Sequence, residues 1–208
     1  MKRNIIITLL SISVIFLFNS CSTVKNITQT LLNLEKLQFR LENLNGFSIA
    51  GIGLKDKNSL SDFSIMDGVK LVNAYETKSF PAEFILNVAA KNPNDGTGGL
   101  KQASATLASL EWQLYIDDVP TIAGVTTTPV EIPGTGQSTI IPIKISLDLY
   151  KFFNDKGYNS VINLALAIGG VKGSAARLKL DAKPTVTTQF GNISYPGRIT
   201  IIDKKFSS

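Results

Sequence analysis

The chain contains no histidine and only one cysteine, Cys21, among its 208 residues. Without histidine, Ser–His and Cys–His nucleophile systems are excluded, and so are histidine-ligated zinc sites. A thiolate metal site needs several cysteines, and no disulfide can form within one copy of the chain. These absences predict a protein that is not an enzyme, has no catalytic residues, cofactor or metal, and depends on its apolar core for stability.

Signatures of phosphate binding are also missing. The glycine-rich segments "NDGTGGLK" (94–101) and "IGGVKG" (168–173) lack the Gly-x-x-x-x-Gly-Lys-Ser/Thr order of a phosphate loop. We expect the first to be a hairpin loop and the second to end a helix. Asp117 and Asp118 could offer oxygens to calcium, but two adjacent acids are more typical of a turn.

The charge pattern gives no sign of a nucleic-acid partner. The net charge is +5, and acidic and basic residues are interleaved along the chain. A nucleic-acid interface would need basic residues gathered on one face. The pattern therefore predicts a solvated surface and no nucleic-acid binding.

The longest apolar run lies at the N-terminus. Lys2 and Arg3 precede an apolar stretch over 5–18, and small or polar residues follow it. This is the order of an export signal, and the run is shorter than the roughly 20 residues that span a bilayer. Residues 1–20 are predicted to be a signal peptide, and removing them leaves 19 basic and 16 acidic residues.

Cys21 follows this run directly, in the order "LFNSC" over 17–21. The order resembles the processing site of bacterial lipoproteins, although the usual leucine is replaced by Phe18. The resemblance implies that Cys21 becomes the new N-terminus and carries acyl chains, palmitate among them. An unpaired thiol in an exported protein is otherwise unusual. The alternatives are an ordinary signal peptide with an incidental cysteine, or an uncleaved anchor.

The lipoprotein resemblance also implies a location. Acyl chains on Cys21 would attach the chain to the membrane of a bacterial cell envelope. Ser22, directly after the cysteine, implies sorting to the outer membrane. Residues 21–35 are then a lipidated cysteine and tether.

Alternation of apolar and polar residues predicts strands, because successive side chains of a strand point to opposite faces. It is clearest over 80–91, and it recurs over 110–117, 139–147 and 176–183. Pro142 lacks a backbone donor and so predicts an edge strand or a bulge.

The pattern before residue 46 is ambiguous. Leu34, Leu37, Leu41 and Leu44 have helical spacing, but residues 37–42 also alternate as in a strand. We favour a strand from about Lys36, because the dipeptide at 45–46, Asn-Gly, is a hairpin signal.

Residues 148–168 interrupt the two-residue period. Two apolar clusters flank "NDKGYN", which predicts a helical insert. Asn159 or Ser160 would cap its helix, and Gly169 with Gly170 would end it. Around this insert, the short strands and regular turns predict a mainly β fold, an antiparallel β-sandwich over 36–206.

A family resemblance appears over 87–147. An ordered set of features carries it: Asn92-Pro93-Asn94 after a strand, a leucine-rich strand with Tyr115, the region of Gly124, "PVEIPGTGQ", and an isoleucine-rich strand. In this set the chain resembles the group 2 late embryogenesis abundant proteins, the domain also called WHy. The resemblance covers most of 80–202 and more weakly 36–79. The glycine-rich "DGTGG" departs from the family pattern.

The resemblance implies a fibronectin III-like or immunoglobulin-like sandwich of about seven strands with a helix packed against it, and a role in stress or desiccation tolerance. It brings no catalytic residues. Asn92, Pro93 and Asn94 are expected to be structural, because asparagine side chains bond local backbone and proline fixes φ. Trp112 is expected in the core, and a ligand-stacking platform is the alternative.

Three functions remain open. The first is a monomeric, lipid-anchored, non-enzymatic envelope protein with a stress-protective or scaffolding role. The second is a binding module for an envelope protein or glycan, which would use loops at one end, 92–102 and 117–124. The third, an enzyme, requires a pocket with converging polar groups. An apolar patch over those loops would favour the second, and a uniformly polar surface the first.

Overall fold

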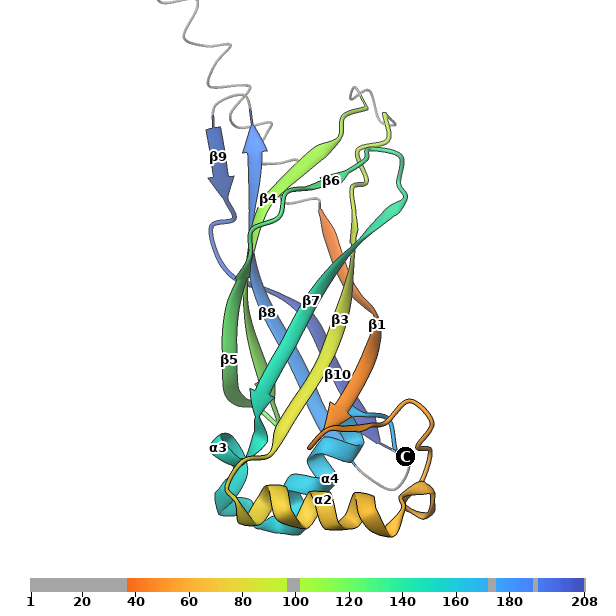
Figure 1. Cartoon of the computed structure of the whole chain (residues 1–208). Coiled ribbons are helices and arrows are strands. Elements are labelled where there is room, and N and C mark those ends of the chain that lie inside the picture. Colours follow the sequence, from red (N-terminus) through yellow and green to blue (C-terminus); the bar gives the residue numbers. More distant parts are fainter. Residues whose placement is uncertain (1–36, 97–101, 172–174, 189–190, 208) are drawn as a thin grey trace, which may run out of the picture.

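The computed structural model describes residues 37–96, 102–171, 175–188 and 191–207. These residues form two antiparallel sheets that pack face to face, with helices covering one end (Figure 1). The predicted fold class, a mainly β sandwich with a helical insert, is confirmed. The described residues form ten strands instead of about seven, because several are short additions at the edges.

The first sheet has the order β2-β1-β3-β7. Its strands are β1 (Gln38–Ile49), β2 (Ile52–Gly53), β3 (Pro81–Lys91) and β7 (Ser138–Asp148). β3 and β7 pair without interruption, with Leu86 opposite Ile143. β7 is an edge strand, as Pro142 predicts.

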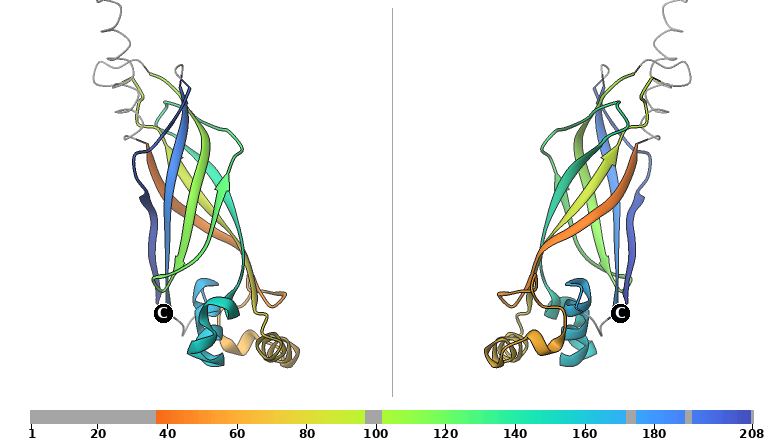
Figure 2. Two further views of the ribbon diagram at one scale, coloured as in Figure 1. Left: turned by 90° about the vertical axis from the view of Figure 1, so that its left-hand side faces the viewer. Right: turned by 90° about the vertical axis from the view of Figure 1, so that its right-hand side faces the viewer.

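The second sheet has the order β10-β8-β4-β5. Its strands are β4 (Ala105–Ile116), β5 (Val119–Thr126), β8 (Ala175–Thr188) and β10 (Ile199–Ser207). The short strands β6 (Val130–Ile132) and β9 (Gly191–Ser194) pair with β4 and β8. In Figure 2 the two sheets are seen from their sides, with the helices below them.

The inward faces of the strands form one apolar core. In β3 the residues that alternate inward are buried, as predicted: Phe80 just before the strand, then Ala82, Phe84, Leu86, Val88 and Ala90. Leu110, Leu114 and Ile116 of β4 and Leu178 and Leu180 of β8 are completely buried as well. Each such side chain contributes about 1.5–3 kcal/mol on burial, and these residues hold the sheets together.

Trp112 lies in this core, as predicted, and is 8% exposed. Its ring packs on β5, where Gly124 lies opposite it in the β4–β5 pair. A Cβ at Gly124 would come within 2.4 Å of the ring. The glycine therefore makes the space that the tryptophan fills.

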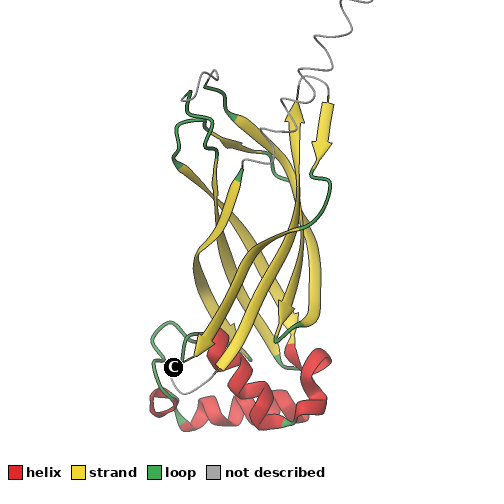
Figure 3. Cartoon of the chain, turned by 180° about the vertical axis from the view of Figure 1, so that it is seen from behind, coloured by secondary structure: helices red, strands yellow, loops and turns green. Residues whose placement is uncertain are grey.

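Helices form the lower end of the molecule in Figure 3. α3 (Leu149–Phe153), the 3₁₀ turn η3 (Asn154–Lys156) and α4 (Tyr158–Ile168) make up the predicted insert. α4 ends at Gly169, as predicted, but its N-cap is Gly157 and not Asn159 or Ser160. At φ 78° Gly157 turns the chain sharply between η3 and α4, so the helix begins earlier.

A second helical segment was not predicted. The turn η1 (Leu60–Asp62) and α2 (Ile65–Glu76) lie between β2 and β3. Leu71 and Ala74 of α2 are buried. Tyr75 packs edge-on against Tyr150 and Tyr158, with ring centroids 5.2 Å apart in each pair, and this joins α2 to the insert.

The Asn-Gly dipeptide at 45–46 is not a hairpin, and that prediction was wrong. β1 continues through it, and Gly46 has φ 61° at a shift in the β1–β3 register between Asn45 and Ser48. This is a β-bulge, in which a left-handed glycine adds a residue to one strand. The hairpin follows at Ala50 and Gly51.

Helices cover one end of the sandwich, and β1 begins at the other end. Gln38, where β1 begins, lies beside Lys91 and therefore at the end opposite the helices. No helix within the described ranges has the length and apolarity needed to cross a membrane. The predicted signal peptide and tether, residues 1–35, lie outside the described residues, so those boundaries stay predictions.

We expect Gly124→Val to destabilise the protein by about 1–3 kcal/mol, because the added side chain overlaps the Trp112 ring. Urea unfolding followed by tryptophan fluorescence would measure the change. Gly197→Ala is the control, since nothing lies within 4 Å of a Cβ there. Equal stability of the two variants would contradict the packing described for Trp112.

Candidate functional site

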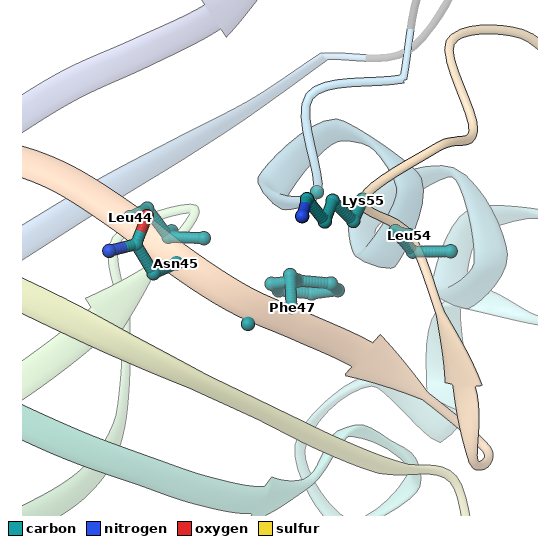
Figure 4. Close-up of a pocket in the computed structure, with 7 residues that line it drawn as sticks. Leu44, Asn45, Phe47, Leu54 and Lys55 are labelled. Atoms are coloured by element: carbon teal, nitrogen blue, oxygen red, sulfur yellow. The ribbon is translucent and has the colours of Figure 1, made fainter.

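A partly open pocket lies beside β1 near the helical end of the sandwich. It has a volume of about 450 Å³ and is lined by residues 44–47, Leu54, Lys55 and Gly169. We call it the β1 pocket, and Figure 4 shows its lining residues. Its volume falls within the range of about 300–1,000 Å³ that is usual for small-molecule sites.

The bulge at Gly46 shapes the strand side of this pocket. A second register shift lies earlier in β1, between Leu41 and Asn43, so the inward-facing residues across the two shifts are spaced by three instead of two: Leu41, Leu44 and Phe47. The extra residues turn outward, and the strand bends away from regular pairing. Bulges are frequent next to binding sites because they redirect side chains.

Phe47 and Leu54 form an apolar part of the pocket wall, beside the polar Asn45 and Lys55. Phe47 is 6% exposed and stacks on Phe84 at a centroid distance of 5.2 Å. Leu54 is buried, and its backbone N–H donates to the Phe47 carbonyl at 2.9 Å. A Cβ at Gly169 would lie 2.4 Å from Leu54 Cδ1, so this glycine gives the wall its close packing.

Lys55 is the charged residue at the pocket. Figure 4 shows its side chain extending across the opening above the Phe47 ring. Lys55 makes no ion pair or side-chain hydrogen bond with any described residue. Lys57, two residues later, instead pairs with Asp67 at 3.0 Å.

α2 presents a second exposed apolar surface. Its outward side carries the α2 apolar stripe, which consists of Ile65, Met66, Val69 and Val72. Ile65 is 91% exposed and Val69 56%. A shallow groove runs beside these residues past Gly68, whose Cβ position is open. A soluble surface rarely keeps several large apolar residues together on one helix without a use for them.

A network of polar contacts fixes the start of α2. Ser64 is the N-cap and accepts from the Asp67 N–H at 3.1 Å, while the Ser64 N–H donates to Asp67 Oδ2 at 3.0 Å. Lys57 Nζ donates to the same carboxylate. The Ser64 N–H and the Lys57 ammonium lower the pKa of Asp67 from 3.8 to about 2.

Asp117 and Asp118 lie in the β4–β5 turn and bond to Arg177. Asp117 Oδ1 accepts from the Arg177 N–H at 2.8 Å, and Asp118 accepts from Nη1 at 2.9 Å. Arg177 also forms a two-bond pair with Asp203 of β10, which lowers the pKa of that carboxyl. This arrangement ties the turn to β8 and β10. In the part of the chain that the structure describes, no three His, Cys, Asp or Glu residues are grouped as metal ligands.

Asn92 and Asn94 are buried beside Pro93, where β3 ends. Asn92 Nδ2 donates to the carbonyls of Ala103 and Ile132, at 2.9 and 3.3 Å. Asn92 Oδ1 accepts from the Asn94 N–H. These bonds join the two ends of the β3–β4 connection to each other and to the end of β6.

The two loops considered for recognition do not share an end. Residues 92–102 precede β4, and 117–124 follow it, so the length of β4 separates them. Residues 97–101 of the first loop lie outside the described residues, as does Cys21. The prediction that both loops act together at one end was therefore wrong.

Two surfaces were missed from the sequence: the β1 pocket and the α2 apolar stripe. Ser64 and Asp67 form a capping box, which is a signal for a helix start. That signal could have revealed α2 and hence its exposed residues. The pocket depends on a bulge and on contacts between segments that are distant in the sequence. Gly46 is the one signal in the sequence for the bulge, and the sequence gives no signal for the contacts.

Comparisons with known proteins give no family assignment. No protein-family model matches the chain, and no curated protein matches it. A solved structure of a protein from Archaeoglobus fulgidus is similar over 81% of this chain and 97% of its own, with 12% identity and a TM-score of 0.39.

Two further solved structures are similar. One, described as a candidate late embryogenesis abundant protein, matches 91% of this chain and 87% of its own, with 13% identity and a TM-score of 0.40. The other, from Arabidopsis thaliana, matches 61% and 70%, with 11% identity and a TM-score of 0.36. All three likenesses are distant, and none says what this chain does.

We expect acid to weaken the start of α2. The pKa of Asp67 is lowered on folding, so its contribution to stability is present above about pH 4 and is lost as the pH falls toward 2. Asp67→Asn should reduce stability at neutral pH and flatten the pH dependence between 4 and 2. Urea unfolding at several pH values would measure this.

Asp56→Asn serves as the control, because Asp56 is exposed and bonds to no described residue. It should leave the pH dependence as in the wild type. Identical curves for Asp67→Asn and the wild type would contradict the role given to Asp67.

Proposed function

We propose that this protein is a lipid-anchored, non-enzymatic component of a bacterial cell envelope, held at the outer membrane by acyl chains on Cys21. The main support is the "LFNSC" order after an apolar run. Acyl chains contribute about 0.8 kcal/mol per buried CH₂, so several chains on one residue anchor a protein stably.

The geometry of the sandwich is compatible with such an anchor. β1 begins at the end opposite the helices, and 15 residues separate Cys21 from Leu37. Extended, a segment of this length spans about 50 Å. An anchor at Cys21 would therefore leave the helical end, with the β1 pocket and the α2 apolar stripe, free to face away from the membrane.

The proposed lack of catalysis is supported by how the acidic groups are used. Asp67, Asp117 and Asp203 each hold a structural contact with a lysine, an arginine or a backbone N–H. Among the described residues that line the β1 pocket, one is charged, Lys55. A set of converging polar groups, which catalysis requires, is not found among the described residues of this pocket.

The biological role that we propose is stress-protective or scaffolding, in a monomeric protein without cofactors. This role rests on the resemblance of residues 87–147 to the group 2 late embryogenesis abundant proteins. In such a role the apolar core only holds the sandwich together, and the exposed residues make the contacts with other molecules.

Replacing Cys21 tests the anchor. In bacterial cells supplied with an alkyne-labelled palmitate, the wild type should incorporate the label and partition into detergent. Cys21→Ala should incorporate none and should lose the partitioning, whereas Ser22→Ala, the neighbouring control, should still be labelled. A Cys21→Ala chain that stays in the membrane like the wild type, or a mature N-terminus elsewhere by mass spectrometry, would contradict the proposal.

A second candidate function, a binding module, is favoured by the α2 apolar stripe. We infer that such a module would contact an envelope protein and not a glycan, because the four exposed side chains are aliphatic or thioether groups. Gly68 leaves room for close approach beside them. This surface replaces the two loops as the recognition region.

A matched pair of substitutions tests this candidate. Val69 on α2 and Val125 on β5 are both 56% exposed. Val69→Lys should abolish a specific crosslink between the full chain and an envelope protein, while Val125→Lys should preserve it. Crosslinking in intact cells with mass spectrometry would measure both. Loss of the crosslink in both variants, or in neither, would contradict a role for the stripe.

A further inference from the structure

We propose that the β1 pocket binds an amphipathic anion with a linear apolar tail and one negatively charged head group, such as a fatty acid. The inference goes beyond the anchoring function and does not depend on whether Cys21 is acylated. It rests on the shape of the pocket, on the apolar part of its wall beside a polar part, and on the position of Lys55.

The walls are suited to an alkyl tail. Leu44, Phe47 and Leu54 give the pocket aliphatic and aromatic surface. Phe47 and Leu54 are held in place by stacking on Phe84 and by the tight contact at Gly169. A site whose walls are already ordered loses little conformational freedom when a ligand binds.

The rim is suited to a single negative charge. Lys55 extends across the opening in Figure 4, and Asn45 lies at the other end of the pocket. One ammonium group and one amide can donate hydrogen bonds to a carboxylate. A nucleotide or a polyphosphate would need several cations, and among the described residues that line this pocket Lys55 is the one cation.

The contrast with Lys57 supports a ligand role for Lys55. Lys57 is committed to the fold, because it donates to Asp67 and to the Asp62 carbonyl and lies over the Phe63 ring. Lys55 has no such contact with the described residues. Its alkyl stem extends above the Phe47 ring while its charge stays at the opening, and this leaves the ammonium group available to an anion.

The pocket also has a structural reason to stay open. It lies where β1 bends at the Gly46 bulge, and β2 pairs with β1 only at Ser48 and Ile49. Within the described ranges, β1 therefore has no hydrogen-bonded strand on its outer side over the residues that line the pocket. A ligand tail could enter from this side without breaking the sheet.

A photoreactive fatty acid tests the proposal. The full chain, reconstituted in nanodiscs of zwitterionic phospholipid, would be irradiated with a diazirine-bearing palmitate, and the labelled peptides would be identified by mass spectrometry. We expect labelling of the peptides that contain residues 44–47 and 54–55. Decanoate should compete for this labelling, and decanol, which has the same tail and no charge, should compete much less.

Variants separate the charge from the cavity. Lys55→Glu should reduce labelling of these peptides about tenfold, as expected for the loss of one charge-assisted hydrogen bond. Lys70→Glu makes the same charge change at an exposed site on α2 and should leave labelling unchanged. Leu44→Trp should fill the pocket and abolish labelling, while Leu41→Trp, one inward position earlier, should not.

Each result decides the question. Labelling that persists in both Lys55→Glu and Leu44→Trp would overturn the site. Equal competition by decanol and decanoate would overturn the anionic class of ligand. If Leu44→Trp fails to fold, as judged by circular dichroism, the Lys55→Glu and Lys70→Glu pair still tests the proposal, since both lysines are exposed.

Discussion

The packing of two inward-facing apolar surfaces is the constraint on which the rest of this structure depends. With one cysteine in the chain, no internal disulfide can support the sandwich. Strand residues such as Leu86, Leu114 and Leu180 are therefore completely buried. Gly124 shows how closely this core is fitted, because its missing side chain makes the space for Trp112. Surface features can vary around such a core without loss of the fold.

The sequence predicted the parts of the fold in which local pattern and tertiary environment agree. Alternation over 80–91 predicted β3, and Pro142 predicted the edge position of β7, because both are set by backbone geometry.

α2 was missed because its apolar residues lie on two sides. Leu71 faces the core, whereas Val69 faces solvent, so no single amphipathic stripe marks the helix.

The candidate sites were less predictable, since they arise from irregularities. The three-residue spacing of Leu41 and Leu44 suits a helix. In the structure both residues lie in β1, and a shift in the strand register between them accounts for this spacing. The dipeptide at Gly46 suggests a turn, and the same left-handed geometry also serves a bulge. Which of the two forms depends on β3, about forty residues later. Because β1 forms a bulge and not a turn at Gly46, the chain turns back later, at Ala50 and Gly51, and this places Lys55 beside the pocket.

The outer edge of β1 is mostly unpaired, and this affects how copies of the protein behave when they are crowded together. Among the described residues, β1 is paired there only near its end, at Ser48 and Ile49. Unpaired strand edges promote aggregation by adding strands from other molecules, and charged side chains and bulges oppose this. Arg40 and Glu42, which pair with each other at 3.1 Å, lie on this strand at the first of its two register shifts. Copies that the proposed anchor concentrates in the plane of a membrane would collide often, and these features would keep their edges from joining into a continuous sheet.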